Sequence, residues 1–206
     1  MADTSGDRYL ASVTRSWEAA TRLSDPRENP AALLNLAEEA RSIAGKTPSL
    51  YSAVVKAETS AAAGDHATAV AELQEAEALL ERPLTPDRRN HEGTLRVVQS
   101  LVYSINGDAS RANKAQTTAQ SLYRSYEFPS IQLKLHEAIL HAPTDPSNAL
   151  NEAVKIMQDL SPERRIARVR VNARRVINAL PGPACTLPAA QDLRTLISAQ
   201  SPATHL

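Results

Sequence analysis

The prolines of this 206-residue chain divide it into segments that are typical of helices. All 13 prolines lie between runs with apolar periodicity, and none lies in the middle of such a run. Proline at the first helical position has no N–H to leave unsatisfied, and a short polar side chain before it can cap the helix. Five pairs therefore predict helix starts: Asn29-Pro30, Thr47-Pro48, Thr85-Pro86, Asp145-Pro146 and Ser161-Pro162.

The runs between these starts are rich in Ala and Leu, and none shows a strand-like period of two over a useful length. Ala, Leu, Arg, Glu and Gln all favour helices. Short loops force consecutive helices to lie antiparallel. We therefore expect an all-α protein of about ten helices, near 7–23, 30–45, 48–63, 66–82, 88–106, 109–125, 129–142, 146–160, 162–180 and 187–199.

Composition excludes several classes of protein. The 23 Lys and Arg are balanced by 23 Asp and Glu, so the chain is not a globally basic nucleic-acid binder. The single cysteine, Cys185, has no internal partner for a disulfide, and no leader-like segment follows Met1. No apolar run approaches the length of a membrane span. We predict a soluble cytoplasmic protein.

Two segments repeat one pattern around a Gly-Asp pair. A small residue precedes the pair by seven positions, and two alanines seven apart follow it. Small side chains let two helices approach closely, and glycine can adopt the positive φ that reverses the chain. The two sets are Ala57, Gly64-Asp65, Ala69 and Ala76, then Ser100, Gly107-Asp108, Ala112 and Ala119.

This pattern resembles tetratricopeptide repeats. The resemblance covers 50–82 and 93–125, and it is weaker over 129–160, where Glu137 and Ile156 replace the expected small residues. Residues 7–45 resemble a degenerate hairpin, and 162–199 would cap the array. The resemblance implies one domain over 1–206, a right-handed α-solenoid of antiparallel hairpins. An unrelated helical bundle would share the helix count but not the repeated Gly-Asp turns.

A second resemblance lies at the C-terminus. Ser161-Pro-Glu-Arg-Arg, the Arg/Val run after it and the Pro188 to Leu196 segment are similar to the end of the sensor half of bacterial helix-turn-helix transcription regulators. The segment from Met1 to Gly45 lacks a two-helix recognition pattern. We therefore expect a sensor or interaction module of bacterial regulation without a DNA-binding domain.

In tetratricopeptide arrays, the first helix of each hairpin lines a concave groove. The resemblance therefore implies an apolar groove, suited to an amphipathic helix, an apolar peptide or a small effector. The same residues could instead face a neighbouring helix, or be covered by Trp17 or the C-terminal helix. The implied groove residues are Tyr51, Val54, Val55, Glu58, Ala62, Thr94, Val97, Val98, Leu101 and Ile105, with Ile131, Lys134, Ala138 and His141 from the weaker repeat.

Arginine is concentrated near the C-terminus, where residues 161–206 contain seven Arg and two acidic residues. On a helix over 162–180, Arg164, Arg168 and Arg175 form a basic patch opposite the apolar face, flanked by Arg165, Arg170 and Arg174. We expect a solvated basic face. The alternatives are a site for nucleic acid or another acidic partner, and docking onto the acidic stretch from Glu72 to Glu92.

No motif predicts catalysis, a metal or a cofactor. Gly45-Lys46-Thr47 lacks the earlier glycine and the strand of a phosphate loop. His136 and His141 are five residues apart, about 140° around a helix, and so they do not share a metal. Cys185 has no neighbouring base. We expect a non-enzymatic module with a protein, peptide or small-molecule partner, and the sequence leaves its oligomeric state open.

Overall fold

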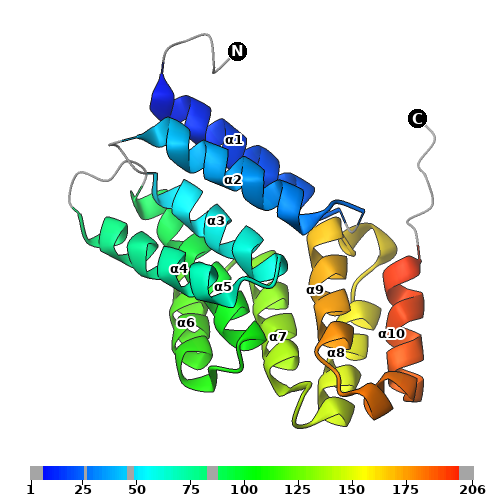
Figure 1. Ribbon diagram of the computed structural model, residues 1–206. Coiled ribbons are helices and arrows are strands. Elements are labelled where there is room, and N and C mark those ends of the chain that lie inside the picture. Colours follow the sequence, from blue (N-terminus) through cyan, green and yellow to red (C-terminus); the bar gives the residue numbers. More distant parts are fainter. Residues whose placement is uncertain (1–6, 26, 46–48, 83–87, 200–206) are drawn as a thin grey trace.

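The computed structural model describes residues 7–25, 27–45, 49–82 and 88–199. These residues form ten α-helices and two short 3-10 helices and contain no strand, which confirms the all-α prediction (Figure 1). None of the described helices is both long enough and apolar enough to span a bilayer. The elements are α1 (Arg8–Arg22), α2 (Pro30–Ala44), α3 (Leu50–Ala62), α4 (His66–Glu81), α5 (Arg88–Ile105), α6 (Ala109–Leu122), α7 (Glu127–His141), α8 (Pro146–Asp159), η2 (Pro162–Arg164), α9 (Ala167–Asn178), η3 (Gly182–Thr186) and α10 (Pro188–Ser198).

The helix expected over 162–180 is wrong in its first part. Pro162 starts only the 3-10 helix η2, and α9 begins at Ala167. The break has a local cause at Arg165, whose guanidinium Nε donates to the carbonyl of Met157 at 2.8 Å and that of Leu160 at 3.1 Å. Arg165 thus satisfies carbonyls at the end of α8, in a conformation that a continuous helix would not allow.

Two of the other proline pairs start helices as predicted. Asn29 caps α2 by accepting from the N–H of Ala31 at 3.0 Å, and Asp145 caps α8 by accepting from the N–H of Asn148 at 3.3 Å. The pairs at 47–48 and 85–86 lie outside the described residues. The cap of α3 is Ser49, whose hydroxyl accepts from the N–H of Ser52.

The two Gly-Asp turns have nearly the same geometry. Gly64 and Gly107 adopt φ of 83° and 71°, which reverses the chain after α3 and after α5. The N–H of Asp65 then donates to the carbonyl of Ser60 at 2.9 Å, and the N–H of Asp108 to that of Tyr103 at 3.0 Å. Each aspartate also accepts an N–H of the next helix at 3.0 Å, so it caps α4 or α6.

The small residues of the repeat lie where helices touch. Their burial is complete, with 0 % exposure, and their size lets paired helices approach closely. Glu137, which stands at the small position of the weaker repeat, is exposed. The fully buried members are Ala57, Ala69, Ala76, Ser100, Ala112 and Ala119.

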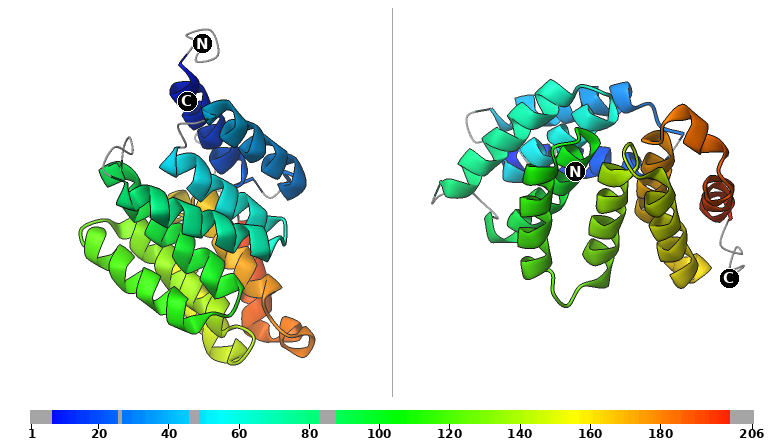
Figure 2. Two further views of the ribbon diagram at one scale, coloured as in Figure 1. Left: turned by 60° about the vertical axis from the view of Figure 1, so that its left-hand side comes forward. Right: turned by 90° about the horizontal axis from the view of Figure 1, so that it is seen from below.

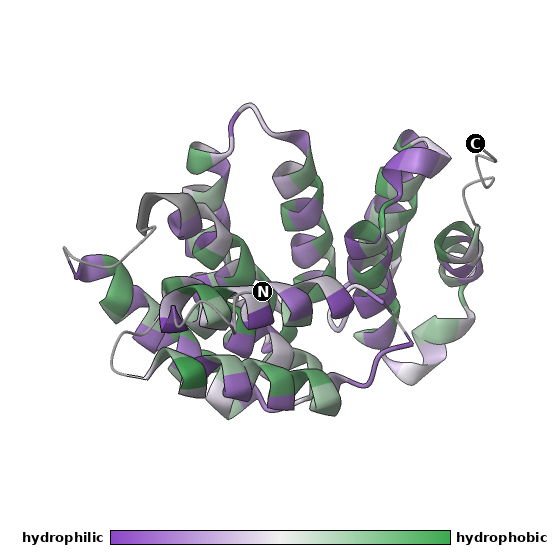
Figure 3. Cartoon of the chain, turned by 90° about the horizontal axis from the view of Figure 1, so that it is seen from above, coloured by the Kyte–Doolittle hydropathy of each residue, from purple (hydrophilic) through white to green (hydrophobic). Residues whose placement is uncertain are grey.

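The helices pack in two ways. Helices α1 and α2, α3 and α4, α5 and α6, and α7 and α8 are antiparallel neighbours. The odd-numbered helices α1, α3, α5, α7 and α9 also contact one another in order, and we call them the odd-helix row. In the right-hand view of Figure 2, the helices from α4 to α10 spread from one side of the molecule to the other, with α1 behind the middle. Figure 3 shows hydrophilic and hydrophobic positions alternating along the helices, as amphipathic packing requires.

Candidate functional site

Five of the predicted groove residues line one pocket of about 200 Å³ on the odd-helix row. Glu58 comes from α3, and the other four come from consecutive turns of α5. Helices α7 and α9 complete the pocket with Pro129, Gln132, His136, Arg168 and Asn172, and Tyr123 adds an aromatic wall. We call this the Glu58–His136 pocket. Its predicted members are Glu58, Thr94, Val97, Val98 and Leu101.

The structure places the other predicted groove residues elsewhere. Val54 and Val55 are 1 % and 2 % exposed and belong to the apolar core around α3. Tyr51 is half-buried and its ring stacks on His91 at 4.9 Å between centroids. Lys134 and His141 line a separate cavity of about 370 Å³ between α7 and α8. The implied groove residues therefore do not line one continuous cavity.

Helix α9 lies against the implied groove residues of α3, in line with the alternative that a C-terminal helix covers them. Arg168 of α9 pairs with Glu58 of α3, and its second nitrogen Nη2 donates to the carbonyl of Ala20 in α1 at 3.4 Å. Trp17 covers nothing of the pocket, because its side chain is 63 % exposed and does not line it.

The predicted basic patch does not form. Arg164 lies in η2, where it pairs with Glu127 and its guanidinium sits 5.9 Å from the ring centroid of Phe128. Arg168 and Arg175 turn toward Glu58, whose side chain is only 5 % exposed. The expectation of a solvated basic face is therefore wrong for Arg168 and Arg175, because an inward carboxylate pairs with both.

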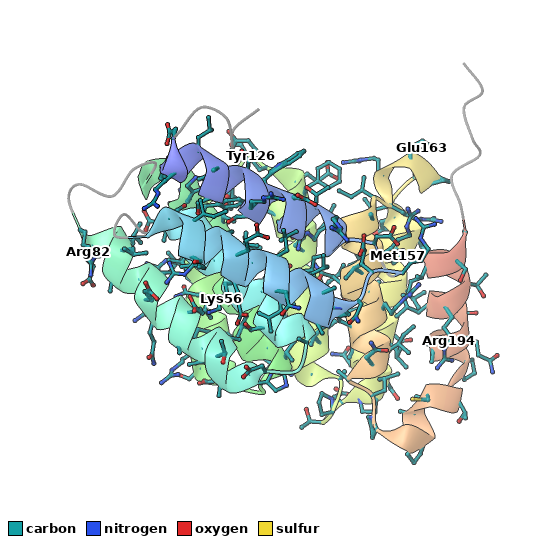
Figure 4. All side chains as sticks on the ribbon, turned by 45° about the horizontal axis from the view of Figure 1, so that its top comes forward. Lys56, Arg82, Tyr126, Met157, Glu163 and Arg194 are labelled. Atoms are coloured by element: carbon teal, nitrogen blue, oxygen red, sulfur yellow. The ribbon has the colours of Figure 1, made fainter. Side chains whose placement is uncertain are left out.

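Among the described residues of the stretch from Glu72 to Glu92, no acidic residue pairs with a C-terminal arginine. Glu72 forms ion pairs with Lys56, whose Nζ lies 2.9 Å from Oε1, and with Arg41, whose Nε lies 3.6 Å from Oε2. These pairs connect α4 to α3 and α2. Figure 4 shows Lys56 on α3 in this region. Glu77 pairs with Arg96 at 2.9 Å. The arginine-rich helix pairs with Glu58 and not with the stretch from Glu72 to Glu92 that the sequence offered.

A buried chain of polar side chains forms the floor of the Glu58–His136 pocket. Ser100 Oγ lies 3.0 Å from Nδ1 of His136, and Nε2 of His136 lies 3.2 Å from the amide nitrogen of Asn172. The amide oxygen of Asn172 accepts from Nη1 of Arg175 at 2.7 Å, and the same nitrogen lies 3.9 Å from Oε1 of Glu58. The chain links α5, α7, α9 and α3.

The donors of this chain determine the tautomer of His136. A guanidinium only donates, so the oxygen of Asn172 faces Arg175 and the NH2 group of Asn172 donates to His136 Nε2. The proton of the neutral ring is then on Nδ1, which donates to Ser100 Oγ. Burial, together with the positive charges of Arg175 and Arg168, lowers the pKa of His136 from 6.5 to about 3.

This geometry does not activate Ser100 as a nucleophile. In a Ser–His pair that cleaves substrates, the imidazole takes the hydroxyl proton. Here the imidazole donates its own proton to Ser100, and the serine is 0 % exposed. The row of hydrogen-bonded polar side chains therefore acts as a rigid polar support for the pocket. Within the described ranges, His, Cys, Asp and Glu form no cluster of three or more that could hold a metal.

Sequence reasoning missed the importance of Ser100, His136 and Asn172. His136 lies three residues after Leu133 and four before Leu140, which is the apolar period of α7, and this spacing signals burial. Glu58 is the one acidic residue within the otherwise Ala- and Val-rich α3, which signals a buried charge that requires a partner.

Comparisons with known proteins give no match to a protein-family model, to a curated protein or to a solved structure.

Proposed function

We propose that the chain is a tetratricopeptide-like solenoid and a non-enzymatic interaction module that binds a protein or peptide at the Glu58–His136 pocket. The observation that carries this proposal is the gathering of five implied groove residues around one pocket of about 200 Å³. The order of contacts along the odd-helix row also supports a solenoid, because stacked hairpins place their first helices side by side.

The size of the pocket selects the kind of partner. Pockets that enclose a drug-sized ligand usually measure about 300–1,000 Å³, and this one is smaller. It therefore suits one anchoring side chain of a peptide or helix better than a whole effector. Val97, Val98 and Leu101 supply apolar walls, and His136 and Asn172 supply a polar floor. An anchor with an apolar body and a polar tip fits this combination.

The alternative of a nucleic-acid or acidic-partner site at Arg164, Arg168 and Arg175 has less support. All three arginines are within ion-pair distance of glutamates, which reduces the charge that they present to a ligand. The role in bacterial regulation remains part of the proposal on the strength of the resemblance, and the cytoplasmic location on the strength of the composition.

A peptide selection tests the proposed pocket. Peptides selected from a random library on the native protein are measured against two variants, Gln132→Trp, which fills the pocket, and Gln120→Trp, on the exposed side of α6. We expect at least tenfold weaker binding to Gln132→Trp and unchanged binding to Gln120→Trp. Equal binding to both variants, or a library that yields no binder, contradicts the proposal.

A further inference from the structure

The opposite side of α9 borders two adjoining cavities of about 540 and 420 Å³. They share Asp25, Val171 and Arg174, and we call the two together the Arg174 trough. Arg168 and Asn172 of α9 face the Glu58–His136 pocket, whereas Arg170, Val171 and Arg174 face the trough. No described residue lines both the trough and the pocket, so they are separate cavities, and Arg175 of the trough's smaller cavity reaches the pocket's polar floor only through Asn172 and Glu58.

Two arginines of the trough have no acidic partner among the described residues. Arg170 and Arg174 are one helical turn apart on α9 and both line the larger cavity. Like charges at this spacing repel each other, so neither arginine is stabilised by the other. Such a pair differs from Arg168 and Arg175, which share Glu58.

The acidic groups near the trough are already neutralised. Asp25 forms an ion pair with Arg27, with Oδ2 at 2.6 Å from Nη2. Glu28 forms an ion pair with Arg22, with Oε1 at 2.9 Å from Nε. The hydrogen bonds from Arg27 lower the pKa of Asp25 to about 2, so this ion pair persists over the neutral range. The positive charges of Arg170 and Arg174 therefore remain unbalanced by any acidic group among the described residues of the trough.

The smaller cavity supplies an apolar surface next to this charge. Leu23, Leu33, Ala61, Ile105 and Ile139 line it, and Arg174 stands at its junction with the larger cavity. At the other end, Ala167 of the first turn of α9 lines the larger cavity. That turn has no side-chain cap, so its partial positive charge adds to that of the arginines.

We propose that the Arg174 trough binds a small amphipathic anion, with its carboxylate or phosphate head on Arg170 and Arg174 and its apolar body against Ile105 and Val171. Guanidinium groups bind both kinds of oxyanion in paired hydrogen bonds. The volume of each cavity lies within the range of small-molecule pockets. This site is independent of the peptide pocket, and each proposal can fail alone.

The test uses three probes of one chain length: octanoate, octyl phosphate and neutral octanol. Calorimetry measures the affinity of each probe, and changes in the amide NMR shifts of α9 locate its binding. We expect an anion to bind at least tenfold more tightly than octanol. Arg170→Gln and Arg174→Gln should each weaken its binding about tenfold, the value of one charge-assisted hydrogen bond. Arg124→Gln, an exposed arginine between α6 and α7, is the matched control and should change nothing.

The head group that binds more tightly assigns the natural ligand to carboxylic acids or to phosphate esters. Three results overturn the proposal: equal binding of octanol, equal binding by the two trough variants and the native protein, or no binding of either anion. Urea denaturation curves check that the two variants fold. Both arginines lie at the surface of α9, so we expect both variants to unfold in one cooperative transition.

Discussion

Replacing Glu58 by glutamine tests how α9 is held against the odd-helix row. The change removes the negative charge shared by Arg168 and Arg175, whose side chains are 26 % and 13 % exposed. Removing one partner of a buried ion pair costs about 3–5 kcal/mol. Arg168 is partly solvated and the glutamine oxygen still accepts a hydrogen bond. We therefore expect the free energy of unfolding to fall by about 3 kcal/mol, the low end of that range.

Urea denaturation measures this loss from the transition midpoint and slope. The matched control is Glu137→Gln on the exposed side of α7, which should change the free energy of unfolding by less than about 0.5 kcal/mol. A double-mutant cycle with Arg168→Gln should give a coupling energy of about 1–3 kcal/mol. If Glu58→Gln matches the control, or the coupling energy is zero, the ion pair does not hold α9.

Three further predictions concern the turns, the buried histidine and the trough. Gly64→Ala and Gly107→Ala should each destabilise by about 1–2 kcal/mol from backbone strain alone. Gly182→Ala, at ordinary φ and with the same open space around its Cβ, should change stability by less than about 0.5 kcal/mol in the same urea assay, and equal losses in all three would contradict the turn geometry. Because the folded pKa of His136 is about 3, its contribution to stability is complete above pH 6.5 and decreases as the unfolded chain takes up a proton below that pH. Between pH 7 and pH 5 the native protein should therefore lose about 2 kcal/mol more than His136→Gln, and parallel pH profiles would refute this. Arg170→Gln should raise stability by about 0.2–0.5 kcal/mol by removing a like-charge neighbour, whereas Arg168→Gln should lower it; thermal unfolding that shows both losing stability would place Arg170 in the structural network.

Local chemistry made much of the fold predictable. Gly64 and Gly107 with their following aspartates, and Asn29 and Asp145 before their prolines, act through the backbone within a few residues, so their patterns can be read directly. The break before α9 could not be read this way. It depends on Arg165 reaching back to carbonyls of α8, which competes with the helix start predicted at Ser161-Pro162.

The candidate site was predictable only in part. The positions of Thr94, Val97, Val98 and Leu101 follow from helical period, and these residues do line one pocket. The pairing of Arg168 with Glu58 joins residues 110 positions apart, and periodicity within one helix contains no information on such a contact. For this reason the sequence predicted solvated arginines where the structure has a buried ion pair.

The side-chain NMR spectrum of His136 tests most directly whether α9 supplies the polar floor of the pocket. Long-range nitrogen–proton correlations identify the protonated ring nitrogen and follow its titration. We expect a proton on Nδ1, an unprotonated Nε2, and no titration of the ring between pH 8 and pH 5. A proton on Nε2, or titration of His136 near its ordinary pKa of 6.5, would contradict the arrangement of Asn172 and Arg175 beside it.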